Sequence, residues 1–161
     1  MPRPDSYSRT QIVLHWLIVL AVLFQYVAHD QISSVWHARM AGTVPNEPSF
    51  SFHAAVGVLI LILMIWRIWL RFSHGAPALP ESEPAWGRIL AQSVQGLLYL
   101  SLILLPFSGS MAWVFGIGEA IGVHVLLKNL VLLLVLLHIA GALAQQFWFK
   151  SDALMKMIGR A

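Results

Sequence analysis

The chain contains four apolar segments that are each long enough to cross a membrane as a helix, over about 12–28, 52–70, 89–107 and 121–147. An α-helix rises 1.5 Å per residue, so about 20 residues span a hydrocarbon core of about 30 Å. The first and third segments just reach that length. A spanning segment must satisfy its own backbone hydrogen bonds, which segments of this length do as helices. We therefore predict an all-α fold, an integral membrane four-helix up-down bundle formed by residues 1–161 as a single domain.

The composition restricts the chemistry further. Hydrophobic residues make up 58% of the chain, charged residues 11%, and the mean hydropathy is +0.74, which excludes an ordinary soluble domain. The chain has no cysteine, which excludes disulfides, iron–sulfur clusters, thiolate-bound zinc and covalently attached haem. Any metal would be held by histidine, methionine or carboxylate side chains.

Three polar connections separate the segments, at 29–51, 73–88 and, as a shorter turn, 108–120. Pro106 and Gly109 are expected to bend or end the third helix. The first segment holds His15 and Gln25 and lacks a cleavage site with small residues, so we interpret it as a retained span and not a secretory signal.

The basic residues predict the orientation of the bundle. With four spans, eight of the ten fall on one side: Arg3, Arg9, Arg67, Arg71, Arg88, Lys150, Lys156 and Arg160. Because basic residues are enriched on the cytoplasmic side, both termini are expected to be cytoplasmic. Only Arg39 and Lys128 lie toward the other side. A lipid surface explains this distribution better than a nucleic acid, so no nucleic-acid partner is expected.

Four histidines lie within the apolar segments. His124 and His138 are fourteen residues apart, which places them within about 40° on one helix face and about 21 Å apart along the axis. His15 lies near the cytoplasmic end of the first span, and His53 lies at the opposite end of the second. An antiparallel bundle then pairs His15 with His138 on the inner side and His53 with His124 on the outer side.

Such pairs suit a haem that is held by two axial imidazoles from facing helices. Ionisable side chains within a membrane are costly unless they are paired, so four of them at two matched depths favour two bis-histidine haems. Each histidine could instead form a hydrogen bond between helices, in a membrane protein without haem. His29, His37 and His74 fall in the connections, where we expect solvated side chains, or at most an adventitious metal site at His29 and His37.

Several stretches resemble the bacterial diheme cytochrome b-561 family: "RTQIVLHWL" (9–17), "FHAAVGVLILILMIWRIWLR" (52–71), "LLYLSLILLPFSG" (97–109), "LHIAGAL" and "KSDALMKM" (within 137–157). The resemblance implies that His15, His53, His124 and His138 ligate the iron of two haem b groups in the bacterial inner membrane. It also implies transmembrane electron transfer, with superoxide oxidised on the periplasmic side and electrons passed to ubiquinone near the inner haem.

The chain departs from that family at two positions near the inner pair. Many members have histidines where this chain has Gln95 and Gln145. A glutamine amide can bind a quinone carbonyl, but it cannot titrate and deliver a proton. These two residues are therefore either quinone ligands or hydrogen-bonding residues between helices.

Three charged residues have two interpretations each. Arg67 and Arg71 either pair with haem propionates or anchor the second span among lipid headgroups. Lys128, one turn deeper than His124, either snorkels to the outer surface or neutralises a propionate and attracts an anion such as superoxide.

The second functional hypothesis is a cytochrome b subunit that anchors a partner dehydrogenase in the membrane and relays its electrons. The sequence has no Ser/His/Asp arrangement, paired catalytic carboxylates or phosphate-binding loop that would indicate a hydrolase or a nucleotide-driven pump.

Overall fold

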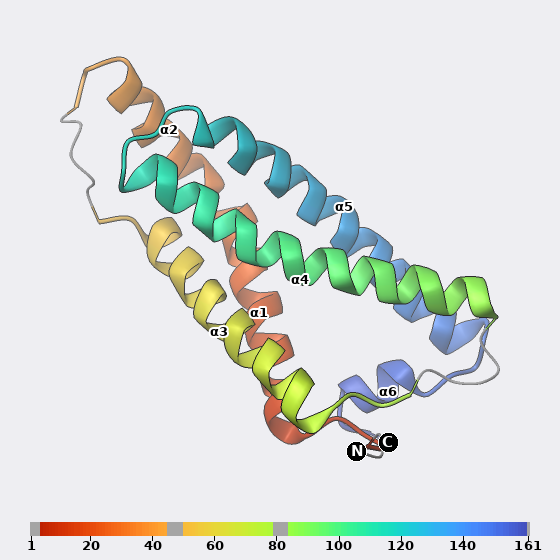
Figure 1. Ribbon diagram of the computed structural model, residues 1–161. Helices are drawn as coiled ribbons and strands as arrows, with labels where there is room; N and C mark the ends of the chain where they lie inside the picture. The colour runs from red at the N-terminus through yellow and green to blue at the C-terminus, as the bar shows by residue number, and fades with distance from the viewer. Residues whose placement is uncertain (1–3, 45–49, 79–83, 161) are drawn as a thin grey trace.

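The computed structural model describes residues 4–44, 50–78 and 84–160, and this part of the chain contains helices and no strand. Four long helices are apolar enough to cross a membrane: α1 (Arg9–Val27), α3 (Phe52–His74), α4 (Ala85–Trp113) and α5 (Ala120–Phe147). Two shorter helices accompany them, α2 (His29–Met40) and α6 (Ala153–Met157). Figure 1 shows α1 beside α3 and α4 beside α5, with the two pairs close together at the α2 end and further apart toward α6. The predicted all-α four-helix membrane bundle is confirmed.

Polar residues set the ends of the first two spans. The Ser8 hydroxyl accepts a hydrogen bond from the Gln11 amide, and the Gln11 side chain accepts one from the Ser8 amide, which forms a capping box at the start of α1. The Ser51 hydroxyl caps the start of α3 by accepting a hydrogen bond from the amide of Ala54. Gly75 follows the end of α3 with a φ of 75°, a conformation that glycine adopts without strain.

The packed core lies midway between the two predicted levels of histidines. It consists of five buried side chains from all four spans, Ile18, Ile60, Met64, Leu102 and Val131. Val131 is seven residues from both His124 and His138. Other large apolar side chains face outward, such as Leu20 and Leu126, which are 62% and 69% exposed. This inverted pattern is typical of helices in lipid, because apolar side chains there need no burial within the protein.

The polar connection predicted at 29–51 contains a short helix that was not predicted, because α2 occupies its first part. Its sequence, HDQISSVWHARM, is much less apolar than the spans, so its hydropathy does not mark it as a helix. A polar helix of this length owes its stability mainly to tertiary packing, which a sequence pattern does not report.

The third span also continues further than predicted. The expected turn at 108–120 begins only after Trp113, and Pro106 lies inside α4. Proline has no N–H, so Pro106 cannot donate the helical hydrogen bond to the Leu102 carbonyl four residues earlier. The Ser108 and Ser110 hydroxyls donate to the carbonyls of Leu105 and Pro106, each at 2.9 Å.

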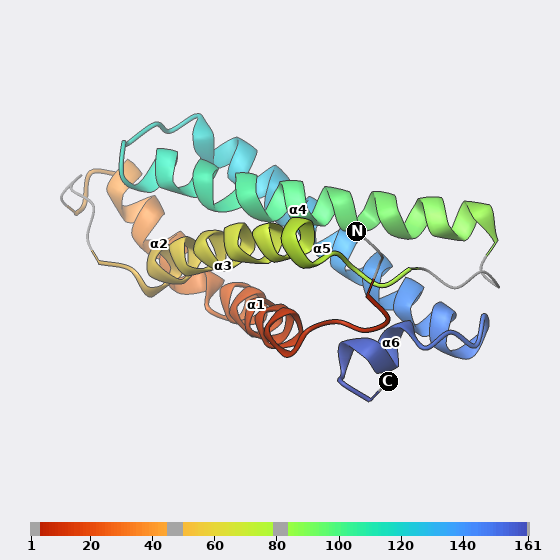
Figure 2. The same ribbon diagram turned by 60° about the horizontal axis from the view of Figure 1, so that its bottom comes forward.

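Both termini lie at the end of the bundle that carries α6, as Figures 1 and 2 show. The hydrogen bond from the Trp16 indole N–H to the Met157 carbonyl, 3.1 Å long, holds this end of the chain against α1. α2 lies at the opposite end. We call the α6 end the inner end and the α2 end the outer end. Arg3, one of the basic residues used to predict the orientation, lies outside the described residues.

Candidate cofactor sites

The inner histidines come together from the first and fourth spans. His15 on α1 and His138 on α5 are both partly buried, and their ring centroids lie 6.2 Å apart with 67° between the ring planes. Trp16 packs its edge against His15 at 5.3 Å between centroids. The pairing predicted from depth therefore agrees with the positions of these two rings.

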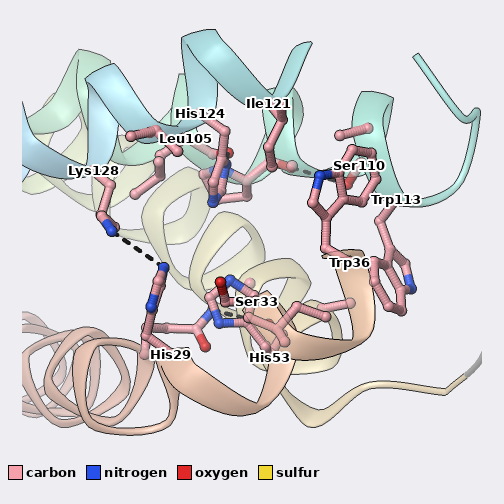
Figure 3. A pocket seen from close by; sticks show the side chains of 18 of the residues that line it. His29, Ser33, Trp36, His53, Leu105, Ser110, Trp113, Ile121, His124 and Lys128 are labelled. Atoms are coloured by element: carbon pink, nitrogen blue, oxygen red, sulfur yellow. Dashed lines mark hydrogen bonds between the residues drawn. The ribbon is translucent and has the colours of Figure 1, made fainter. Parts of the chain in front are cut away.

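The outer histidines form a second pair with nearly the same geometry. His53 on α3 and His124 on α5 have their ring centroids 6.2 Å apart, with 68° between the planes. Figure 3 shows the two rings facing each other from opposite helices. Two pairs with matching separations thus lie at the two ends of α5.

This separation fits two axial ligands of one metal ion. A metal–nitrogen bond is about 2 Å long and a ring centre lies about 1 Å from its nitrogen, so two trans imidazoles have centroids about 6 Å apart. The separation of each pair is therefore one at which the two histidines could hold a metal ion, such as the iron of a haem.

A cavity of about 420 Å³ adjoins the outer pair, within the range of known ligand pockets. Its walls are mainly apolar and come from α1 to α5. Gly57 and Gly109 contribute to the wall, and Gly109 makes room for a ligand imidazole. A Cβ atom at Gly109 would stand 2.9 Å from Cε1 and 3.0 Å from Nδ1 of His124.

Hydrogen bonds orient the His124 ring. Its Nδ1 lies 2.9 Å from the Leu105 carbonyl oxygen and 3.3 Å from the Ser108 hydroxyl. A carbonyl oxygen can only accept, so the ring donates from Nδ1 and leaves Nε2 with a lone pair for a metal. At His53, Nδ1 is buried and has no hydrogen-bond partner within the described part of the chain. A buried ring nitrogen without a partner is unusual.

The predicted arginines of the inner end lie in one polar cluster. Arg67 donates to the Gln11 carbonyl at 2.8 Å, and the Gln11 side chain donates to the Gly75 carbonyl at 2.9 Å. The guanidinium of Arg71 lies over the ring of Tyr99 at 5.7 Å. Burial raises the pKa of the nearby Tyr7 phenol, and the positive charges of Arg71 and Arg67 oppose this rise.

The two glutamines that replace family histidines lie on different spans. Gln95 is partly buried on α4, and Gln145 is partly buried near the end of α5, where its backbone carbonyl accepts a hydrogen bond from the Ser151 amide at 2.8 Å. The neighbouring Gln146 was not singled out from the sequence, although its buried side-chain oxygen has no partner among the described residues.

The prediction that His29 is simply solvated was wrong. His29 and His37 both line the outer cavity, and Nε2 of His29 lies 3.1 Å from Nζ of Lys128. The two residues are 99 positions apart, so nothing in the local sequence indicates this contact. His74 is exposed, and its ring pairs with the Ser73 hydroxyl at 2.8 Å.

Comparison with known proteins supports a single family over nearly the whole chain. Residues 6–160 match the family model described as prokaryotic cytochrome b561. The chain is 36% identical to cytochrome b562 of Cereibacter sphaeroides over 158 positions, which cover 98% of each protein. It is 23% identical to cytochrome b561 homolog 1 of Escherichia coli, over 97% of this chain and 98% of the relative. It is 25% identical to a protein of Yersinia pestis named probable superoxide oxidase CybB, over 95% of this chain and 96% of the relative.

Proposed function

Because the chain belongs to the prokaryotic cytochrome b561 family, whose members are membrane b-type cytochromes that transfer electrons, we propose that it carries electrons across the bacterial inner membrane through two haem b groups. His15 and His138 hold one haem, and His53 and His124 hold the other. The observation that carries this proposal is the equal 6.2 Å separation of the two histidine pairs. A bound haem supplies reversible one-electron exchange at its iron.

The chain's own residues hold and orient the cofactor. The Leu105 carbonyl fixes the tautomer of His124, which leaves Nε2 directed away from that hydrogen bond. The absence of a side chain at Gly109 leaves room for the ring. Between the two levels, the buried cluster around Met64 and Val131 excludes water from the middle of the bundle.

Arg67 and Arg71 are suited to bind the propionates of the inner haem. Arg67 is partly buried and lies near both inner histidines, and guanidinium groups match carboxylates in sites with little water. Arg71 contacts Tyr99 on α4, so it also serves to hold α3 against α4. Anchoring among headgroups remains the alternative role for Arg71.

We propose superoxide as the outer electron donor and ubiquinone as the inner acceptor. Superoxide gives up one electron and leaves as dioxygen, and the positive charge of Lys128 at the outer cavity attracts such an anion. Ubiquinone takes up two electrons and two protons to become ubiquinol. Gln95 and Gln145 can each donate a hydrogen bond to a quinone carbonyl, but the protons must come from water or from another group.

The second candidate function is a membrane anchor that relays electrons for a partner dehydrogenase. The observation that favours it is the presence of Gln95 and Gln145, which cannot titrate, on the inner halves of α4 and α5. In that case the inner haem exchanges electrons with a protein and not with a quinone.

A reduced-minus-oxidised visible spectrum and a haem count test the histidine ligands. We expect a b-type spectrum with two haems per chain in the wild type, and about one per chain after His138→Leu or His53→Leu, because each variant removes one axial ligand. His74→Leu is the matched control and should retain both haems. A wild-type protein without haem would contradict the proposal.

Stopped-flow kinetics separate the two candidate functions. If the protein is a superoxide oxidase, superoxide reduces the haems rapidly and added ubiquinone reoxidises them. Slow reduction by superoxide, or haems that remain reduced in the presence of quinone, would favour the relay function.

A further inference from the structure

Lys128 and His29 meet at the side of the outer cavity. Lys128 lies on α5 one turn after His124, and His29 lies at the start of α2, directly after the end of α1. Their nitrogens are 3.1 Å apart, and Figure 3 shows this contact bridging the two helices beside His53 and His124. All four side chains line the same cavity.

The charge of this pair is not balanced within the described part of the chain, where no carboxylate oxygen lies within 4.0 Å of the Lys128 ammonium. An ammonium group can only donate, so it donates to Nε2 of His29, and the ring proton of a neutral imidazole then sits on Nδ1. Nδ1 faces Asp30, but at 3.8 Å and with the Asp30 side chain fully exposed to solvent. A cation inside a membrane span is costly unless an anion or a polar group compensates it.

The position of Lys128 argues against simple snorkelling to the surface. A lysine that snorkels extends its side chain toward water, whereas this one is partly buried and is held against a cavity wall by an imidazole from another helix. The Tyr26 hydroxyl donates to the backbone carbonyl of Lys128, which ties α5 to α1 at the same height. His29 therefore acts as a positioning residue that keeps the ammonium directed toward the cavity.

We propose that Lys128 and His29 bind a carboxylate group of the cofactor in the outer cavity, namely a propionate of the outer haem. This inference rests on the proposed function. The group that this pair binds is an anion. It can be a propionate of the haem or a small anion from solution such as superoxide. We favour the propionate because the cation pair and the two candidate ligands line one cavity, so a single molecule that fills it contacts both.

The test uses the full-length protein with both haems bound, and compares wild type with Lys128→Gln, His29→Gln and the control His74→Gln. The first measurement is the rate of haem transfer to excess apomyoglobin. We expect one of the two haems to leave about tenfold faster from Lys128→Gln, because a charged hydrogen bond is lost, and severalfold faster from His29→Gln. The second measurement is a redox titration, in which the midpoint potential of that haem should fall, because a nearby positive charge disfavours the ferric state. The other haem and the control should not change.

Reconstitution with haem b dimethyl ester distinguishes the two sources of the anion. If the pair binds a propionate, the wild type with the ester should release its outer haem as fast as Lys128→Gln does, and the ester should change the variant no further. If the pair binds only a solution anion, both variants retain the wild-type rate of haem release and differ from the wild type in the salt dependence of their reaction with superoxide. That second result would overturn the inference.

The inference and the proposed function fail in different ways. If the wild type and both variants retain their two haems equally well, the proposed propionate site is overturned, but the proposed function as a cytochrome is not. A wild type without haem would overturn the proposed function and the inference with it. The spectrum of the inner haem reports whether each variant has folded.

Discussion

Gly109 is the residue at which the addition of a single methyl group, as in Gly109→Ala, has the clearest expected effect. The Cβ atom of an alanine there would stand 2.9 Å from Cε1 of His124, closer than nonbonded carbons approach. The ring cannot simply turn away, because its Nδ1 is held by the Leu105 carbonyl at 2.9 Å. The glycine therefore belongs to the outer site, although it has no group that could bind a cofactor.

We predict that Gly109→Ala loses the outer haem and keeps the inner one. The haem count should fall from about two per chain to about one, and only the spectral component of the outer haem should disappear. Alanine is more favourable than glycine in a helix by about 1 kcal/mol, so the loss would not reflect a weaker helix.

Gly96→Ala is the matched control on the same helix. Nothing lies within 4 Å of a Cβ atom at Gly96, so this variant should bind two haems and be at least as stable as the wild type. Equal haem contents in both variants would refute the steric role of Gly109.

Among the elements, α2 is joined to the end of α4 through the side chain of Arg39. Its Arg39 side chain is only 5% exposed, and its guanidinium lies 4.8 Å from the ring of Trp113 and 5.9 Å from that of Trp36. Arg39 also donates to the Trp113 carbonyl at 3.3 Å. Both tryptophans line the outer cavity, so Arg39 fixes α2 to the end of α4 as a cover over that cavity.

We predict that Arg39→Gln loosens α2 by about 1–3 kcal/mol, since the variant loses a charged hydrogen bond and its cation–π contacts. Amide hydrogen exchange over 29–40 should become about tenfold faster or more, while exchange in the four spans stays the same. Met40→Gln, a change at an exposed neighbour, should exchange like the wild type. Unchanged exchange in Arg39→Gln would show that the rest of the interface holds α2 without this side chain.

For the whole molecule, the distribution of charge predicts how the bundle sits in the membrane. The basic residues of the described chain collect at the inner end, except for Arg39 and Lys128. Because basic residues are enriched on the cytoplasmic side, the inner haem would lie toward the cytoplasm and the outer cavity toward the periplasm.

Reporter fusions test this orientation. Green fluorescent protein fused after the last residue should fluoresce, since it folds in the cytoplasm. Alkaline phosphatase inserted at Gly116, in the turn between α4 and α5, should be active, since it requires the periplasm. The reverse pattern at both positions would contradict the orientation and would move the superoxide-facing side to the cytoplasm.

The sequence alone determined the features that follow from length and periodicity. Four apolar segments predicted four membrane helices because a bilayer demands about 20 residues with internal hydrogen bonds. The spacing of His124 and His138 placed both on one face of one helix, and depth alone paired His15 with His138. These inferences need only the rise and turn of an α-helix, which local sequence controls.

Only the tertiary structure determined which residues far apart in the sequence contact one another. The sequence did not reveal that a carbonyl beside Pro106 orients His124, that Gly109 makes room for that ring, or that α2 covers the outer cavity. It also could not place His29 against Lys128, because the contact joins segments 99 residues apart and has no periodic signal. Such contacts depend on how helices pack in three dimensions, and helix packing is set by side-chain fit across the whole bundle and not by any local pattern.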